Sequence, residues 1–235
     1  MSRRGDGEYA LTEITEPEFF NEETLQGIYE VNHLLLELLV AAAGRPASEA
    51  RPQFVSALGP ALLGLGASAR EHLERCPVAL VDLEFRNLEW WRQIECSQGA
   101  SATLHSSPGC FPRLQAMQLV QATLTLAWST ARSSRETAII VFGLAPECAA
   151  RLAGLGVPAI QRLAETHGHC VRPRWEADAT FWRELLRIAQ AADSSAPARL
   201  PSIAQYVLLR QFVELVPLPP RPATAETAAT RASRR

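Results

Sequence analysis

Residues 62–73 (LLGLGASAREHL) are echoed by residues 152–163 (LAGLGVPAIQRL), and this repeat decides the fold that we expect for the chain. The offset is 90 residues, and it keeps the Gly-Leu-Gly of 64–66 in step with the Gly-Leu-Gly of 154–156. It also aligns Leu73 with Leu163. Self-similarity at a fixed distance indicates that one structural unit occurs twice in the chain.

The similarity extends beyond this stretch in both directions. Downstream, Phe85 keeps the offset of 90 with Trp175, and one residue of slippage then aligns 90–92 (Trp-Trp-Arg) with 181–183 (Phe-Trp-Arg). Upstream, the pattern of 28–32 (Ile-x-x-Val-Asn) corresponds to that of 117–121 (Met-x-x-Val-Gln). Because twofold dimers are the commonest symmetric assembly, a duplicated unit predicts an internal pseudo-dimer.

We therefore predict a mainly α fold, in which two tandem helical units, each with a short extended segment, form an intramolecular pseudo-dimer. The boundaries are placed at changes of composition and at stretches rich in Pro, Gly and Ser. The expected order is a flexible N-terminus (1–20), a first unit (21–96), a linker (97–111), a second unit (112–216) and a disordered tail rich in Pro, Ala, Thr and Arg (217–235).

Capping residues and prolines predict where the helices begin and end. Asn21, Ser68, Asn87, Ser134 and Asp178 have the side chains of N-caps, and Pro146 and Pro158 suit the first turn of a helix. Alternation of apolar and charged residues predicts short strands over 81–86 and 171–175. The expected helices are 22–43, 53–58, 60–65, 68–75, 88–96, 113–132, 135–142, one from Pro146, one from Pro158 to about His167, 179–191 and one from Pro201 to just before Pro217.

The helices over 24–43 and 113–132 are the longest apolar segments, so we expect them to form the seam of the pseudo-dimer. The first of them is apolar on nearly every face, which is typical of a buried helix or of one packed against a partner. The residues predicted at the seam are Ile28, Val31, Leu35, Leu38, Leu124 and Trp128.

Composition and charge narrow the class of protein. The 235 residues carry a net charge of −2, so bulk charge does not favour nucleic-acid binding by the chain alone. All 23 basic residues are Arg. The start is acidic and lacks an apolar core, and no apolar stretch is long enough to span a bilayer. The five Cys show no C-x-x-C spacing and are interpreted as reduced thiols, which together predicts a cytoplasmic protein without a membrane segment.

The sequence gives little sign of a metal site or of catalysis. The 167–170 stretch (His-x-His-Cys) and the pair His72 and Cys76 resemble halves of a zinc site, but neither supplies four ligands with paired spacing. The glycines of 64–66 lack the third glycine of a dinucleotide-binding loop, and no nucleophile motif is present. We expect no metal, no cofactor and no enzymatic activity, and the sequence leaves open whether Cys76 or Cys170 forms a disulfide.

The C-terminal helices carry a candidate surface for a partner protein or for DNA. The alternative is a solvated face whose arginines pair with Glu184 and Glu214. The aromatic pairs at 90–91 and 181–182 are interpreted mainly as core, with one member of each as a candidate interaction residue. The residues of the candidate surface are Arg183, Arg187, Arg199, Tyr206 and Arg210.

The second half resembles the flagellar transcriptional regulator family FlhD. The similarity spans about residues 113–216, and its most specific part is the helix ending in Leu-Ala-Glu-Thr at 163–166. The first half resembles the family more faintly, through 28–32, and has no equivalent of the last helix. The other segments that carry the resemblance are the aliphatic helix 114–128, Phe-Gly-Leu at 142–144, the small residues of 149–152, Leu-Gly-Val-Pro at 155–158, Arg-Trp at 174–175 and the terminal helix 200–215.

The resemblance implies a helical, dimerising regulator that assembles with a zinc-containing FlhC-like partner and activates flagellar promoters. In that family the partner makes most of the contact with DNA, and the FlhD side contributes through its C-terminal region. The fused second unit would replace homodimerisation, and further homo-oligomerisation stays open. The family's cysteine in the extended segment is displaced by one position here, at Cys170 or Val171, so its inter-subunit disulfide is not carried over.

A second function remains open, because a fold does not fix a function. The missing terminal helix of the first half favours a non-transcriptional adaptor of a flagellar or secretion apparatus built on the same fold. The target genes, the sign of regulation and direct contact with DNA do not follow from the sequence.

Overall fold

The computed structural model describes residues 21–46, 52–96, 111–191 and 203–215. Within these ranges the chain is mainly helical, as the sequence predicts, with one two-stranded antiparallel sheet. The predicted N-terminus 1–20, most of the linker 97–111 and the tail 217–235 lie outside the described residues. The elements are α1 (Glu22–Ala43), α2 (Gln53–Leu63), α3 (Ala67–Glu74), β1 (Val81–Asp82), α4 (Leu88–Cys96), α5 (Arg113–Ser133), α6 (Arg135–Phe142), α7 (Pro146–Gly154), α8 (Val157–Thr166), the 3₁₀ turn η1 (Gly168–Cys170), β2 (Arg172–Pro173), α9 (Ala179–Ala191) and α10 (Ile203–Leu215).

Four of the five predicted N-caps form the expected hydrogen bond, and the prediction for Ser68 is wrong because α3 begins at Ala67 with Gly66 as its N-cap. Asn21 Oδ1 accepts from Thr24 N at 2.7 Å, and Ser134 Oγ accepts from Thr137 N at 3.1 Å. A capping oxygen satisfies one of the N–H groups that a helix start leaves without a partner. These short-range bonds explain why α1 and α6 begin where the sequence indicates.

Several boundaries differ from the prediction, among them that of the second strand, which covers 172–173 where 171–175 was expected. The segment 53–63 is one helix with Pro60 inside it, whereas two short helices were expected. Pro60 lacks the N–H that would bond Ser56 O, but both residues are exposed, so water can solvate that carbonyl. Helix α3 begins at Ala67 after Gly66, and the first strand covers 81–82 alone because the chain turns at 83–86.

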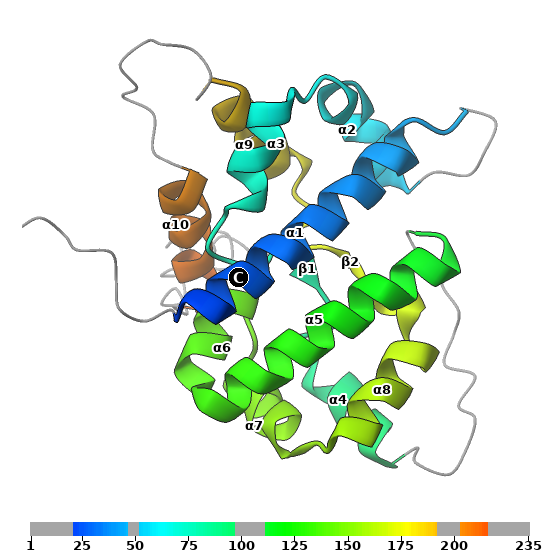
Figure 1. The fold of residues 1–235 in the computed structure, drawn as a ribbon, viewed down its shortest axis with the longest axis vertical. Helices are drawn as coiled ribbons and strands as arrows, with labels where there is room; N and C mark the ends of the chain where they lie inside the picture. Colours follow the sequence, from blue (N-terminus) through cyan, green and yellow to red (C-terminus); the bar gives the residue numbers. More distant parts are fainter. Residues whose placement is uncertain (1–20, 47–51, 97–110, 192–202, 216–235) are drawn as a thin grey trace, which may run out of the picture.

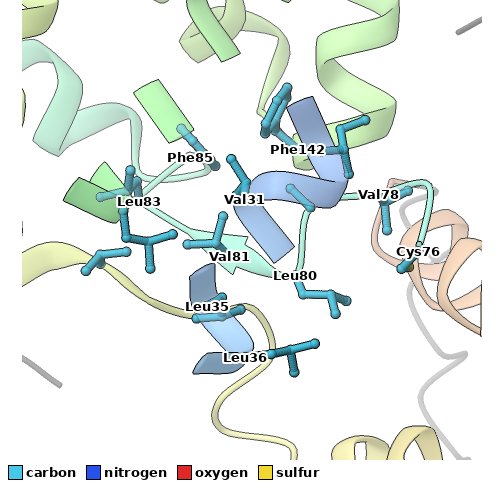
Figure 2. Close-up of a cluster of buried hydrophobic side chains, with 14 of the residues drawn as sticks. Val31, Leu35, Leu36, Cys76, Val78, Leu80, Val81, Leu83, Phe85 and Phe142 are labelled. Carbon is cyan, nitrogen blue, oxygen red and sulfur yellow. The ribbon is translucent and has the colours of Figure 1, made fainter. Parts of the chain in front are cut away.

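The two long helices lie side by side and antiparallel (Figure 1). They approach closely near Gly27, where a Cβ atom would lie 2.6 Å from Leu126 Cδ1. The core is continuous across both halves of the chain. Figure 2 shows Val31 and Leu35 of α1 with Val81, Phe85 and Phe142, which come from β1, the turn after it and α6.

The helix that follows the strand in each half packs on the other half. Helix α9 lies against α2 and α3, and α4 lies against α7 (Figure 1). The Trp182 ring of α9 meets the Phe54 ring of α2 edge-on, with 5.3 Å between ring centroids. Neither half could therefore keep its core intact without a helix from the other.

Backbone geometry recurs at an offset of 91 residues. The two non-glycine residues with positive φ are Glu84 (54°) and Trp175 (57°) among those described. These two residues are 91 apart, whereas the sequence alignment kept an offset of 90 up to Phe85 and Trp175. The change of offset from 90 to 91 therefore occurs before Glu84. The strand register has the same symmetry. Val81 pairs with Pro173, and Asp82 pairs with Arg172. Val81 and Arg172 are 91 residues apart, as are Asp82 and Pro173, so exchanging each residue for its repeat counterpart turns one pair into the other.

The start of the helix that follows each strand repeats bond for bond. Trp90 N donates to Asn87 Oδ1 at 3.1 Å, and Phe181 N donates to Asp178 Oδ1 at 2.9 Å. Asn87 N donates to Glu84 O at 2.9 Å, and Asp178 N donates to Trp175 O at 2.8 Å. The turns before α4 and α9 thus share one hydrogen-bonding pattern.

Candidate functional site

The predicted seam residues belong to α1 and α5, which pack on each other, and most of them are buried in the core. Ile28, Val31, Leu35 and Leu124 are at most 1% exposed, whereas Leu38 and Trp128 are half-buried. Leu38 lines a groove between α1 and α5 together with Gln115 and Gln118. Trp128 instead turns toward α8 and donates from Nε1 to Leu155 O at 2.8 Å.

The residues predicted as a partner or DNA surface do not form one continuous basic face. Arg187 pairs with Glu184 at 2.6 Å, which matches the solvated alternative for that arginine, and Arg210 pairs with Asp178 at 3.2 Å. Arg183 is exposed on α9. Arg199 and the side chain of Glu214 lie outside the described part of the chain.

Helix α10 packs on α9 and α6 through two of the predicted surface residues, Tyr206 and Arg210, and through Gln211. Tyr206 stacks on Phe181 with ring centroids 5.1 Å apart and an interplanar angle of 7°. Gln211, fully buried, donates from Nε2 to Ile139 O of α6 at 3.2 Å. The outer side of α10 exposes two apolar residues one turn apart, Leu209 (66% exposed) and Val213 (51% exposed).

A polar cluster that the sequence did not single out joins the two strands. Arg172 of β2 forms ion pairs with Glu84, which follows β1, and with Glu176 at 3.2 Å. The cluster borders a cavity of about 450 Å³ whose lining includes Asp82 and Arg174. Burial raises the pKa of Asp82, and the hydrogen bond from Phe85 N and the charge of Arg174 oppose that shift. The ion pair of Arg172 with Glu84 joins residues that are 88 apart in the sequence, so no local sequence pattern indicates it.

Gly143 lets the buried Arg174 side chain fit against α6. Its φ is +67°, and a Cβ atom there would lie 1.6 Å from Arg174 Nη2. Arg174 is 5% exposed and lies over the Trp175 ring, with Cζ 4.5 Å from the centroid. Any side chain at position 143 must therefore displace the guanidinium as well as adopt a left-handed backbone.

We predict that Gly143→Ala lowers the free energy of unfolding by about 1–3 kcal/mol, from backbone strain and displacement of Arg174. Gly154→Ala is the matched control, because a Cβ atom at Gly154 meets nothing within 4 Å. The control should lie within about 0.5 kcal/mol of the parent or be more stable. Urea unfolding of the three proteins checks both, and equal effects of the two substitutions would contradict the expectation.

The two half-sites considered for zinc do not come together among the described residues, which contain no group of three or more His, Cys, Asp or Glu able to hold a metal. His167 packs on the Trp90 ring at 5.2 Å between centroids. Burial, with the nearby His169, lowers the pKa of His167 to about 4. His167 is therefore a neutral packing residue at pH 7.

Three of the five cysteines, Cys76, Cys148 and Cys170, are buried free thiols in the structure. Burial raises the pKa of Cys76 to about 12 and the pKa of Cys148 and Cys170 to about 11. Because the thiolate is the reactive form, we predict that these three react slowly with iodoacetamide at pH 8 in the native protein and fast in urea. Peptide mass spectrometry gives the rate at each cysteine. Rapid native alkylation of Cys76 would show that the protein opens at α3 far more often than this packing allows.

No single helix in the described ranges is both long and apolar enough to cross a membrane, and α6 with α7 passes that test only as a pair bent by 119°. The chain matches no protein-family model, no curated protein and no solved structure.

Proposed function

We propose that the chain is a tandem fusion of two FlhD-like units that clasp each other as an intramolecular pseudo-dimer. Three observations support this arrangement: the turns repeated at an offset of 91, the strand register that maps onto itself under that offset, and the exchange of α4 and α9 between halves. Exchange of an identical element is a common route from monomer to dimer, and a linker between two copies makes it permanent.

We further propose that this protein is an FlhD-like transcriptional co-regulator, which assembles with an FlhC-like partner to control flagellar or motility genes. The observation that carries the proposal is the order of elements in the second half. A long helix (α5), a Phe-Gly-Leu step at 142–144, a small-residue helix (α7), a helix ending at Thr166 and a terminal helix (α10) follow one another as the resemblance implies.

The charges support a division of labour in which the partner holds the DNA. Net charge is −2, and two of the arginines on the candidate surface already have carboxylate partners. Affinity for DNA rises with the number of phosphates that Arg and Lys neutralise. We therefore propose a cytoplasmic, non-enzymatic protein with weak DNA affinity alone and promoter binding in the complex.

A gel-shift assay tests this function. The chain alone should leave a flagellar promoter fragment unshifted, and it should increase the fraction shifted by an FlhC-like protein. In the complex, Arg183→Glu should reduce promoter binding, whereas Arg162→Glu, an exposed arginine on α8, should leave it unchanged. Promoter binding that is the same with and without the chain would overturn the proposal.

The second candidate function is an adaptor of a flagellar or secretion apparatus. The observation that favours it is the lack of any described helix on α4 that corresponds to α10 on α9. A pull-down from cell extract separates the two functions. Recovery of RNA polymerase or an FlhC-like protein supports the regulator, and recovery of membrane-apparatus proteins supports the adaptor.

A further inference from the structure

The helices α4 and α9 present the same face after the same turn. Asn87, Trp90 and Ile94 occupy one face of α4 at spacings of three and four residues, and at an offset of 91 they correspond to Asp178, Phe181 and Leu185 of α9. The repeated hydrogen bonds at the start of both helices fix this correspondence independently of side-chain similarity.

On α9 this face is covered by α10. Tyr206 stacks on Phe181, Arg210 pairs with Asp178 at 3.2 Å, and the inner residue Val207 is fully buried. Phe181, whose ring also meets Trp175 at 4.8 Å between centroids, is 5% exposed, and Leu185 is fully buried. A helix of the same molecule thus occupies this face of α9.

On α4 the matching face is not covered by any described residue in this way. Trp90 and Ile94 are only partly buried. The Trp90 ring meets Trp91, at 5.1 Å between ring centroids, and His167, and its side chain hydrogen-bonds Cys170. Figure 1 places α10 beside α6 and α9, at the opposite side of the molecule from α4. A large aromatic residue that keeps an accessible face on a rigid element is typical of an interaction hot spot.

The charge of the two faces differs at one position. Asp178 binds Arg210, but its counterpart Asn87 is neutral, and Asn87 Nδ2 already donates to Glu84 Oε2 at 3.0 Å. A helix that binds α4 would therefore need no counterpart of Arg210, the cation that follows Tyr206 by one turn in α10. The two faces share the hydrogen-bonded turn and the spacing of their apolar residues. They differ in this polar contact and in the residue before the helix, which is Trp175 beside Phe181 and Glu84 at the corresponding position before α4.

We propose that the Asn87–Trp90–Ile94 face of α4 binds an amphipathic α-helix of a partner protein, in the position that α10 takes on α9. The helix carries an aromatic or large aliphatic side chain against Trp90, with apolar neighbours three and four residues away, and an uncharged polar residue opposite Asn87. This inference rests on the geometry repeated at 91 residues and does not depend on FlhC, DNA or transcription.

The test uses the full-length protein labelled with 5-fluorotryptophan, which gives one ¹⁹F signal for each of its five Trp residues. The signal of Trp90 is assigned with Trp90→Phe. The probe is a capped synthetic peptide of residues 203–215 in which Arg210 is replaced by Gln (R210Q), since that change removes the ion pair that favours the α9 site. We expect the peptide to shift the Trp90 signal saturably and to leave the Trp128 signal unmoved.

Two variants make the test specific. Trp90→Ala should weaken binding of a fluorescently labelled peptide roughly tenfold or more, as expected for a hot spot. Arg92→Ala is the control, because Arg92 is exposed on α4 and pairs with Glu89, so it should leave binding unchanged. Circular dichroism establishes that both variants remain folded.

The other occupants give different results, and each would overturn the proposal. A Trp90 signal that moves with protein concentration alone identifies a second copy as the occupant. A Trp90 signal that a soluble gadolinium chelate does not broaden in the free protein shows that the chain covers this face itself. Absence of any peptide-induced shift at millimolar peptide, or shifts confined to Trp175 and Trp182, shows that the face is not a helix site.

Discussion

Replacing Trp182 by alanine should lower the free energy of unfolding by about 3–5 kcal/mol, the usual range for a large aromatic removed from a core. Trp182 is fully buried, and its ring meets Phe54 of α2 edge-on at 5.3 Å. Its Nε1 donates to Arg174 O at 2.7 Å. The substitution removes this packing and leaves that carbonyl without its donor, so two costs add at the place where α9 joins the other half of the chain.

Urea unfolding followed by circular dichroism measures the effect, and Trp182→Phe is the matched variant. Phenylalanine keeps most of the ring contact with Phe54 and loses the hydrogen bond, so its loss should be less than half that of alanine. The two losses should also appear in a single cooperative transition, because α9 packs on α2 and α3. A loss below about 1 kcal/mol for Trp182→Ala, the size of an average substitution, would mean that α9 contributes little to the core.

The elements that short-range signals determine were predictable from the sequence. Asn21 and Ser134 cap helices because a side-chain oxygen three residues before a backbone N–H needs no tertiary context. The repeat also predicted that Trp91 and Trp182 occupy matching positions, and both donate from Nε1 to a backbone carbonyl in the turn before their helix, Glu84 O and Arg174 O.

What long-range packing decides was not predictable. No local pattern shows that α9 leaves its own half for α2 and α3, since the same amphipathic helix would suit either side. Pro60 was taken as a helix boundary because proline normally breaks a helix, and it is tolerated because that face of α2 is exposed. The ion pairs of Arg172 with Glu84 and Glu176 depend on the pairing of two strands far apart in the chain.

The candidate surface on the C-terminal helices shows the same division. The sequence could identify Tyr206 and Arg210 as residues of interest, but it could not show that both face α9, where Phe181 and Asp178 receive them. Residues that look available in a sequence are often those that hold a terminal helix in place. Trp90, treated there mainly as core, is the residue of the pair 90–91 that stays partly accessible, while Trp91 is 1% exposed.

The second large effect is expected at Asn32, whose role the sequence did not reveal. Asn32 is a fully buried polar residue in the middle of α1. Its Nδ2 donates to Cys76 O and Val78 O, both at 3.1 Å, and its Oδ1 accepts from Leu80 N at 2.8 Å. One side chain thus binds three backbone groups on the path from α3 into β1, whereas Cys76 N and Ala79 N of the same segment donate to Leu73 O and Val141 O.

Asn32→Leu should lower the free energy of unfolding by about 3 kcal/mol or more, because several buried backbone groups lose their partner at about 1–3 kcal/mol each. Asn32→Asp should cost a similar amount at pH 7 and less at pH 4, where a protonated carboxyl group can donate one hydrogen bond to these carbonyls. Denaturant unfolding at the two pH values, each compared with the parent at the same pH, measures both effects.

The repeat supplies the control. Gln121 is the residue that the sequence aligns with Asn32, but it is exposed on α5, so Gln121→Leu should change stability by no more than about 0.5 kcal/mol. The buried positions of α1 and α5 correspond at an offset of 88 residues, which places the buried Val120 at the position of Asn32. The segment that Asn32 holds, 76–80, has no regular secondary structure, whereas the stretch before β2 is the 3₁₀ turn η1, in which Cys170 N donates to His167 O at 2.9 Å. Comparable losses for Asn32→Leu and Gln121→Leu would mean that the stretch before β2 also depends on a side chain of α5. The difference in local structure would then not explain why only the first half has a buried asparagine.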